Sequence, residues 1–133
     1  MASKHKKIFV VDDDPGVLHL LGKRLPAAHG YEVVTAQGAA EALRMIRRDP
    51  PDLILLDVIM PGQSGGDLAR DLQKQETTRD IPIVFLTVLL DEKVKGKQRM
   101  SVGGKEFRAV AKPIHMPQLL STLRKALNES ANR

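Results

Sequence analysis

Five short apolar runs, separated by segments of helical length, dominate the sequence. The runs lie at residues 8–11, 31–34, 53–56, 83–86 and 107–111. Between them apolar residues recur at spacings of three and four, which is typical of amphipathic helices. The first, third and fourth runs are almost entirely apolar, which indicates strands that are covered on both faces. This alternation predicts an α/β domain with a doubly wound, five-stranded parallel sheet and helices on both faces.

The alternation fills a chain of 133 residues and leaves no room for a second ordinary domain. We expect a basic N-terminal tail at residues 1–7, one domain at residues 8–129 and a C-terminal tail at residues 130–133. No apolar run approaches the roughly 20 residues of a membrane helix, and no secretory signal opens the chain, so the cytoplasm is the expected compartment. The absence of cysteine excludes disulfides and thiolate metal sites. An aromatic content of 3% argues against a base-stacking platform, and no direct binding of nucleic acid is expected.

Cap and turn residues mark the expected element boundaries. Asp14 followed by Pro15 predicts the start of the first helix. The segment Asp-Pro-Pro-Asp at residues 49–52 ends the second helix. Residues 91–102 are expected to form a short, frayed or distorted helix, because they carry many cations and Gly96 but few apolar residues.

Polar residues follow four of the five apolar runs at the point where each run ends. In an open parallel sheet this edge, beyond the carboxyl ends of the strands, holds the functional crevice. Taken singly, each such residue is commonly a helix cap or a solvated surface group, and Asp14 is fully explained as a cap. The residues at this edge are Asp12, Asp13, Asp14, Asp57, Thr87 and Lys112.

The carboxylates at this edge are harder to explain together than singly. Adjacent strands lie ~4.8 Å apart, so acids that end neighbouring strands would crowd each other. Two like charges about 4 Å apart repel by roughly 4 kcal/mol at an effective dielectric constant of 20. A divalent cation would relieve this repulsion, and carboxylates are typical ligands of Mg²⁺. With a hydroxyl and a lysine in reach, Asp57 could attack phosphorus as a nucleophile in a phosphoryl transfer.

The motifs at these strand ends resemble those of the receiver domain of two-component response regulators. They are VVDDD at residues 10–14, LDVIMPG at 56–62, LT at 86–87 and KP at 112–113, and the resemblance runs from about residue 7 to residue 127. It implies the flavodoxin-like strand order 2-1-3-4-5. It also implies a phosphorelay signalling switch, a phosphoprotein that catalyses its own phosphorylation but is not an enzyme acting on a separate substrate.

The resemblance also implies roles for the acids. Asp57 would be the phosphoacceptor and would take its phosphoryl group from a sensor histidine kinase or a histidine phosphotransfer protein. Asp13, Asp57 and the backbone carbonyl of Ile59 would ligate Mg²⁺, with Asp12 acting mostly through bound water. The output partner is left open, and the domain is expected to be a monomer or a phosphorylation-dependent dimer.

The remaining implied roles concern the phosphoryl group and the switch. Thr87 would hydrogen-bond a phosphoryl oxygen and report phosphorylation, and Lys112 would contact the phosphoryl group. The resemblance also implies a cis peptide bond between Lys112 and Pro113. The family usually has Tyr or Phe three residues before this lysine, where the present chain has Ala109. Phe107 points to the same face of its strand and could serve as a displaced switch residue or simply pack in the core.

One further region departs from the family pattern, and a group of glycines carries no evidence of a phosphate-binding loop. The stretch from residue 87 to residue 112 is longer than usual, so the face that commonly carries output is expected to be atypical. Gly62, Gly65 and Gly66 are expected to form a flexible turn rather than a phosphate-binding fingerprint.

Two other functions are weighed against a phosphorylated receiver. A binding module with the receiver fold and no dependence on phosphorylation is favoured by Ala109 but opposed by the intact set of acids, Thr87 and Lys112. An aspartate-dependent phosphohydrolase generally needs a second acid two residues after its nucleophile, where this chain has Ile59.

Overall fold

One six-stranded sheet organises residues 5–88 and 99–131, the part of the chain that this computed structural model describes. The strand order is β2-β1-β3-β4-β6-β5, and neighbouring strands from β2 to β6 are parallel. This confirms the expected order 2-1-3-4-5, with β6 as the expected fifth strand. The strands are β1 (Lys7–Val11), β2 (Glu32–Ala36), β3 (Leu53–Asp57), β4 (Ile83–Thr87), β5 (Arg99–Val102) and β6 (Lys105–Ala111).

The expected count of five strands was wrong, because β5 adds a sixth at the edge of the sheet. β5 pairs antiparallel with β6, so the sheet is not purely parallel. Gly103 and Gly104 join the two strands, both with positive φ (58° and 81°), as in the tight turns that suit hairpins. Residues 99–102, expected as the end of a helix, therefore form a strand, and residues 91–98 of that expected helix lie outside the described residues.

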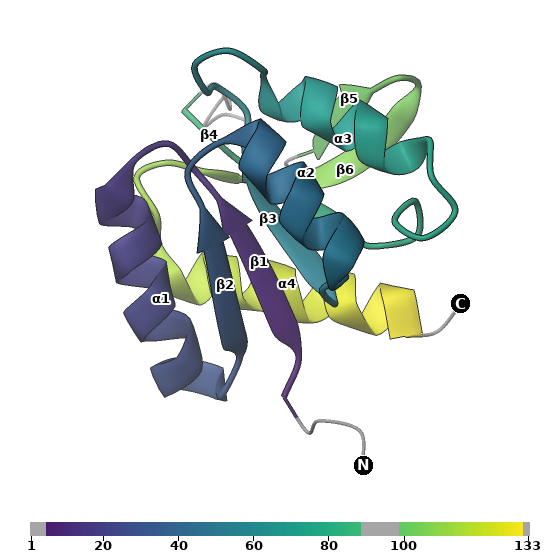
Figure 1. Cartoon of the computed structure of the whole chain (residues 1–133). Helices are drawn as coiled ribbons and strands as arrows, with labels where there is room; N and C mark the ends of the chain where they lie inside the picture. The colour runs from purple at the N-terminus through teal and green to yellow at the C-terminus, as the bar shows by residue number, and fades with distance from the viewer. Residues whose placement is uncertain (1–4, 89–98, 132–133) are drawn as a thin grey trace.

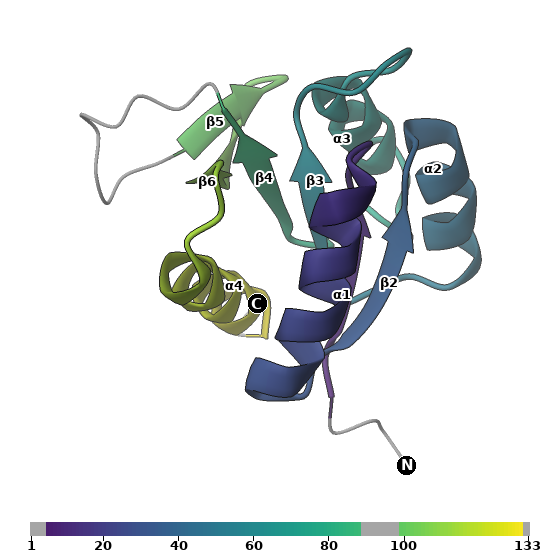
Figure 2. The same cartoon turned by 90° about the vertical axis from the view of Figure 1, so that its left-hand side faces the viewer.

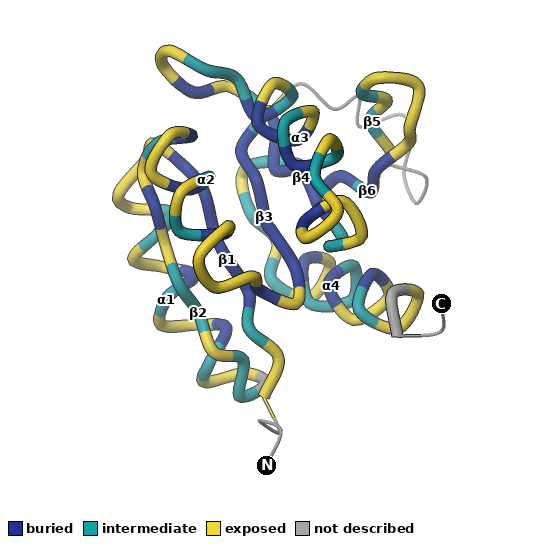
Figure 3. Tube along the Cα trace, turned by 45° about the vertical axis from the view of Figure 1, so that its right-hand side comes forward, coloured by how far each residue is buried: buried dark blue, intermediate teal, exposed yellow. Residues whose placement is uncertain are grey.

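Helices cover both faces of the sheet, as expected (Figures 1 and 2). One core cluster joins the sheet to α2 (Ala39–Arg48) and α3 (Gly65–Gln73). The other joins it to α1 (Pro15–His29) and α4 (Met116–Ala131). Within β1, Phe9 belongs to the first cluster and Val10 to the second, so the strand is buried on both sides. β3 and β4 are buried along their whole length, which matches their apolar sequences (Figure 3).

The helix starts follow from local capping. The Asp14 carboxylate accepts a hydrogen bond from the Gly16 N–H at 2.8 Å, and Pro15 occupies the first helical position, which confirms the expected start of α1. Ser64 caps α3 through a hydrogen bond from the Asp67 N–H at 3.1 Å. α2 ends at Arg48, immediately before the Asp-Pro-Pro-Asp segment at residues 49–52, as expected.

The expectation of a flexible glycine turn after β3 was wrong for two of its three glycines. Gly65 and Gly66 are the first two residues of α3, and Gly65 is buried. Only Gly62 lies in the preceding loop, with φ of 85°.

No helix within residues 5–88 and 99–131 is long and apolar enough to cross a membrane.

Candidate functional site

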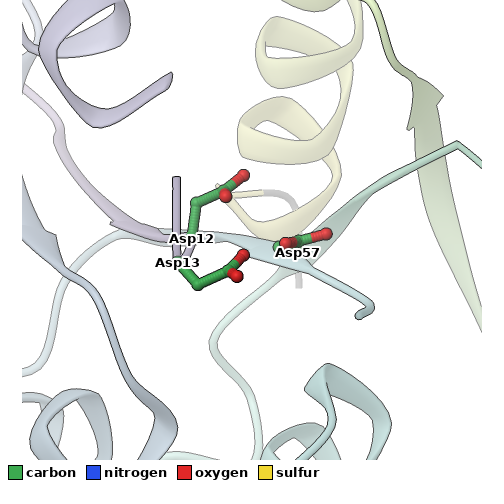
Figure 4. Close-up of side chains that lie close together, drawn as sticks. All are labelled: Asp12, Asp13 and Asp57. Carbon is green, nitrogen blue, oxygen red and sulfur yellow. The ribbon is translucent and has the colours of Figure 1, made fainter. Parts of the chain in front are cut away.

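Three carboxylates meet where β1 and β3 end, as the sequence predicts. Asp12 and Asp13 follow β1, and Asp57 is the last residue of the neighbouring β3. One carboxylate oxygen from each residue lies within 4.8 Å of the other two (Figure 4). Asp12 is 0% exposed and Asp57 is 5% exposed, whereas Asp13 is open to solvent. The site is therefore a partly buried acidic pocket with one accessible side.

The buried carboxylate of Asp12 is held on both of its oxygens. Oδ1 accepts a hydrogen bond from the Asp14 N–H at 2.9 Å. Oδ2 lies 2.7 Å from Lys112 Nζ, an ion pair across the pocket. A buried charge is tolerated when it is both paired and hydrogen-bonded, and Asp12 meets both conditions.

Lys112 reaches the pocket from the end of β6, two strands away from β3. Its Nζ lies 3.5 Å from Asp57 Oδ1, farther than from Asp12. Burial acts to lower the pKa of Lys112, but the hydrogen bond and charge of Asp12 and the charge of Asp57 outweigh it and raise the pKa. The amine is therefore a fixed positive charge at neutral pH. Its peptide bond to Pro113 is cis, as predicted.

Asp57 carries the clearest electrostatic signature of the pocket. Burial and the neighbouring charge of Asp12 raise its pKa to about 6, although Lys112 and the backbone N–H of Ile59 act in the opposite direction. The Ile59 N–H donates to Asp57 Oδ1 at 3.4 Å. A carboxyl with a raised pKa lies in surroundings that stabilise its anion poorly. The single ammonium of Lys112 therefore does not offset the burial of Asp57 and its repulsion by Asp12.

Thr87 lies at the same edge of the sheet. It ends β4, is 1% exposed and stands opposite Ala111, the residue before Lys112. Its carbonyl accepts the Lys112 N–H at 3.0 Å, so the ends of β4 and β6 are joined next to the pocket. The topology thus brings Thr87 and Lys112 to the edge of the sheet that holds the three carboxylates.

Phe107 and Ala109 point to the same face of β6, as predicted, and both belong to the core cluster under α2 and α3. The Phe107 ring packs edge-to-face on Phe85 at 5.5 Å between centroids. Lys105 Nζ lies over the Phe107 ring, 5.4 Å from its centroid. Phe107 is therefore a packed core residue in this conformation, and its role as a displaced switch residue stays a prediction.

Gly65 is a residue of the site that sequence reasoning missed. A Cβ built at this position would lie 2.1 Å from the backbone oxygen of Asp57, closer than any real contact. The Gly65 N–H also donates to the Val58 carbonyl at 2.9 Å. The start of α3 therefore rests directly on the backbone of Asp57, and only glycine permits this approach. No local sequence pattern marks this close approach, because it depends on how α3 packs against the end of β3.

The fold and the site together define a class of protein, an α/β domain of flavodoxin-like strand order with an acidic pocket at the carboxyl edge of its sheet. Comparison with known families is more specific. The model of the response regulator receiver domain matches residues 8–124. The chain belongs to the receiver domain family of two-component response regulators.

Individual relatives agree with this assignment. The chain is 42% identical to the response regulator PleD of Caulobacter vibrioides over 118 residues, 89% of this chain and 25% of PleD. It is 37% identical to the phosphate regulon transcriptional regulatory protein PhoB of Pseudomonas aeruginosa over 125 residues, 94% of this chain and 53% of PhoB. The chain thus spans between a quarter and about half of the length of these curated relatives.

Solved structures agree as well. The chemotaxis protein CheY4 of Vibrio cholerae superposes with a TM-score of 0.78 and 31% identity, covering 92% of this chain and 98% of that one. A sensor protein from Polaromonas sp. JS666 superposes with a TM-score of 0.81 and 26% identity, covering 94% of this chain and 98% of that one.

Proposed function

We propose that Asp57 accepts a phosphoryl group from a phosphohistidine of a sensor histidine kinase or a histidine phosphotransfer protein. Phosphorylation then changes how the domain binds an output partner. The observation that carries this proposal is the convergence of the Asp12, Asp13 and Asp57 carboxylates within 4.8 Å, with Lys112 Nζ 3.5 Å from Asp57. Membership of the receiver family supports the same assignment.

The donor set of the pocket fits Mg²⁺. Hard divalent cations prefer carboxylate and carbonyl oxygens, and three carboxylates meet here. The raised pKa of Asp57 reflects burial and the repulsion between two of these carboxylates, which a bound cation would relieve. Asp13, Asp57 and the Ile59 carbonyl would hold the ion directly, and Asp12 would act through water. When bound, Mg²⁺ would neutralise charge on the phosphoryl oxygens.

The transfer itself needs little more than position and charge from the protein. An Asp57 carboxylate oxygen attacks phosphorus, the P–N bond to the histidine breaks, and the imidazole leaves with the bonding electron pair. The Lys112 ammonium and the Thr87 hydroxyl contact phosphoryl oxygens and stabilise their charge. In this way the domain catalyses its own phosphorylation. It acts as a switch, not as an enzyme that converts a separate substrate.

The proposal is tested by mixing the chain with a phosphorylated histidine kinase that carries labelled phosphate. We expect the label to move to the chain when Mg²⁺ is present and to stay on the kinase when EDTA removes it. No transfer from several kinases, or transfer that is indifferent to EDTA, would contradict the proposal.

The two other functions are less well supported. The comparisons give no support to a receiver fold that works independently of phosphorylation, since the relatives are response regulators. Beryllofluoride, a phosphoryl mimic, is expected to change the affinity for an output partner when Mg²⁺ is present, and an unchanged affinity would favour that alternative. Turnover of a phosphomonoester would be needed to revive a phosphohydrolase, because Ile59 stands where its second acid should be.

The remaining aspects of the proposal are expectations from the sequence and from the family resemblance. We assign the receiver domain to residues 8–129, with short tails on either side. We place the domain in the cytoplasm, as a monomer or a phosphorylation-dependent dimer, with no direct contact to nucleic acid.

Binding of Mg²⁺ should depend on pH through Asp57. Its pKa of about 6 means that a proton occupies the carboxyl at pH 5, whereas the carboxyl is ionised at pH 7.5. Because the proton and the cation compete, the Kd for Mg²⁺ should be about tenfold lower at pH 7.5 than at pH 5. Isothermal titration calorimetry measures this ratio, and Asp57→Asn should remove most of it. Equal Kd values at the two pH values would contradict the prediction.

The phosphorylated domain should lose its phosphoryl group slowly. Ile59, two residues beyond Asp57, is 53% exposed and apolar, so it offers no polar group to orient an attacking water. The other position in this expectation, Leu89, lies outside the described residues. Release of labelled phosphate from purified phosphoprotein measures the lifetime, and Ile59→Asn should shorten it. A half-life of seconds in the unaltered chain would contradict this expectation.

A further inference from the structure

The outer face of α2 carries three exposed arginines, Arg44, Arg47 and Arg48, on its last two turns. Arg44 and Arg48 are one helical turn apart, and Arg47 is adjacent to Arg48. Like charges at this spacing repel each other and destabilise a helix. The last two arginines complement the negative end of the helix dipole. The helix dipole does not account for Arg44, because Arg44 lies outside the last turn of the helix.

No carboxylate of the described residues forms an ion pair with any of the three arginines. The nearest ion pair joins Asp49, directly after the helix, to Lys7. Arg47 Nε donates to the Gln75 side chain at 3.2 Å, which leaves its charge uncompensated. The helix therefore presents three positive charges without an ion-pair partner among the described residues.

Two grooves flank the side chains of Arg44 and Arg48, which line both of them. The groove between α2 and strands β1 and β2 is also lined by Lys7, Phe9, Val34, Met45 and Asp49. The groove on the other side is shallow and widely open, and it is also lined by Ala40, Leu43, Arg47 and Gln63. Apolar side chains thus lie beside the guanidinium groups. Figure 1 shows α2 beside α3 on one face of the sheet, whereas α1 lies on the opposite face.

The chemistry of this surface favours an acidic helix over other occupants. Guanidinium groups bind carboxylates through two parallel hydrogen bonds. Acids one turn apart on a facing helix would match the spacing of Arg44 and Arg48. Ala40 and Leu43 would receive apolar side chains from the same helix, as in helix-in-groove recognition.

Two other occupants fit the surface less well. Glu41 in the first turn and Asp49 after the last turn bracket the arginines. A phosphate backbone running along α2 would meet these acids, whereas a short helix need not. A second copy of the chain docked through α2 would bring the two sets of arginines together.

We propose that the arginine face of α2 binds an acidic amphipathic helix of a protein partner, at a surface separate from the Asp57 pocket. The proposal depends on Arg44, Arg47 and Arg48 and on the adjoining groove, and it requires no phosphorylation. It can therefore fail without affecting the function proposed for Asp57.

The probe for this proposal is a synthetic, fluorescein-labelled helical peptide with glutamates one turn apart and a neighbouring stripe of leucines. Fluorescence anisotropy measures its Kd for the full chain and for Arg44→Gln combined with Arg48→Gln. We expect the double variant to raise the Kd roughly fivefold or more, because two charge contacts are lost. Amide signals of α2 and Gln63 should shift in NMR spectra when the peptide is added.

The matched control removes two exposed cations from the opposite face, Lys23→Gln in α1 and Lys125→Gln in α4. It should change the Kd by less than about twofold, since these residues lie on helices that cover the other side of the sheet. All of these positions are exposed, so the substitutions should leave the thermal unfolding midpoint of the chain unchanged. Equal midpoints would show that every variant is folded. The proposal is overturned if the two double variants weaken binding equally, or if a glutamine version of the peptide binds as tightly. It is also overturned if the unaltered chain does not bind the peptide, prefers a short DNA duplex, or dimerises through α2.

Discussion

Replacement of Asp57 by asparagine is expected to abolish phosphorylation of the chain. The amide has nearly the same size as the carboxyl but offers no anionic oxygen to attack phosphorus. The measurement is the mass of the intact protein after incubation with a phosphorylated kinase and Mg²⁺. The unaltered chain should gain one phosphoryl group, and the variant should gain none.

The same substitution should stabilise the protein when no metal is present. The pKa of Asp57 is about 6 in the folded chain, above its ordinary value of 3.8, so ionisation of the buried carboxyl costs folding free energy. This cost grows as the pH rises from about 4 to about 6 and persists above that range. At pH 7.5 in EDTA, Asp57→Asn should therefore raise the free energy of unfolding by about 1 kcal/mol, allowing for solvent screening and the lost contact to Lys112.

The control for both effects is Asp14→Asn. Asp14 lies next in sequence to the pocket acids but is exposed and caps α1, a role that asparagine fills equally well. This variant should be phosphorylated and should unfold like the unaltered chain. Phosphorylation of Asp57→Asn to the level of the unaltered chain would contradict the assignment of the phosphoacceptor.

Alanine at position 65 is expected to damage both stability and phosphorylation. Its Cβ would lie 2.1 Å from the Asp57 oxygen and 3.0 Å from the Val58 Cα, both of them backbone atoms that no side-chain rotation can move away. Either α3 or the end of β3 must shift. We expect a loss of about 3 kcal/mol in the free energy of unfolding, the upper part of the range for overpacked sites. Urea unfolding followed by circular dichroism measures the loss, and transfer of labelled phosphate should slow as Asp57 is displaced.

Gly66→Ala is the matched control for this variant. The Cβ at position 66 would meet only the Ser64 Oγ at 3.7 Å, an ordinary contact. Because alanine favours the helix more than glycine does, this change should stabilise the chain by about 0.5–1 kcal/mol. Equal effects at the two positions would show that α3 does not rest on Asp57 as described.

The parallel sheet could be predicted because its signals are local. Apolar runs identify β1, β3 and β4, and Asp14 with Pro15 identifies the start of α1. The strand ends then determine which side chains share an edge, so Asp57 and Lys112 could be assigned to one site from sequence order alone. The finer geometry could not be assigned in this way, because Lys112 pairs more closely with Asp12, at 2.7 Å, than with Asp57, at 3.5 Å.

What was missed depends on backbone conformation and on contacts between distant segments. The Gly103-Gly104 pair between two short alternating runs is a hairpin signal, but the surrounding cations favoured interpretation as a weak helix. The role of Gly65 depends on the distance between α3 and β3, which no local pattern contains. Phe107 illustrates the same limit, since its packing on Phe85 joins two strands that only the fold brings together.

The most direct measurement identifies the modified residue chemically. Borohydride reduces an aspartyl phosphate to homoserine, so phosphorylated chain that is reduced, digested and analysed by mass spectrometry reports the position that carried the phosphoryl group. We predict homoserine at position 57 and at no other acid, and only when Mg²⁺ was present during phosphorylation. Homoserine at Asp12, Asp13 or an acid outside the pocket, with Asp57 unchanged, would contradict it.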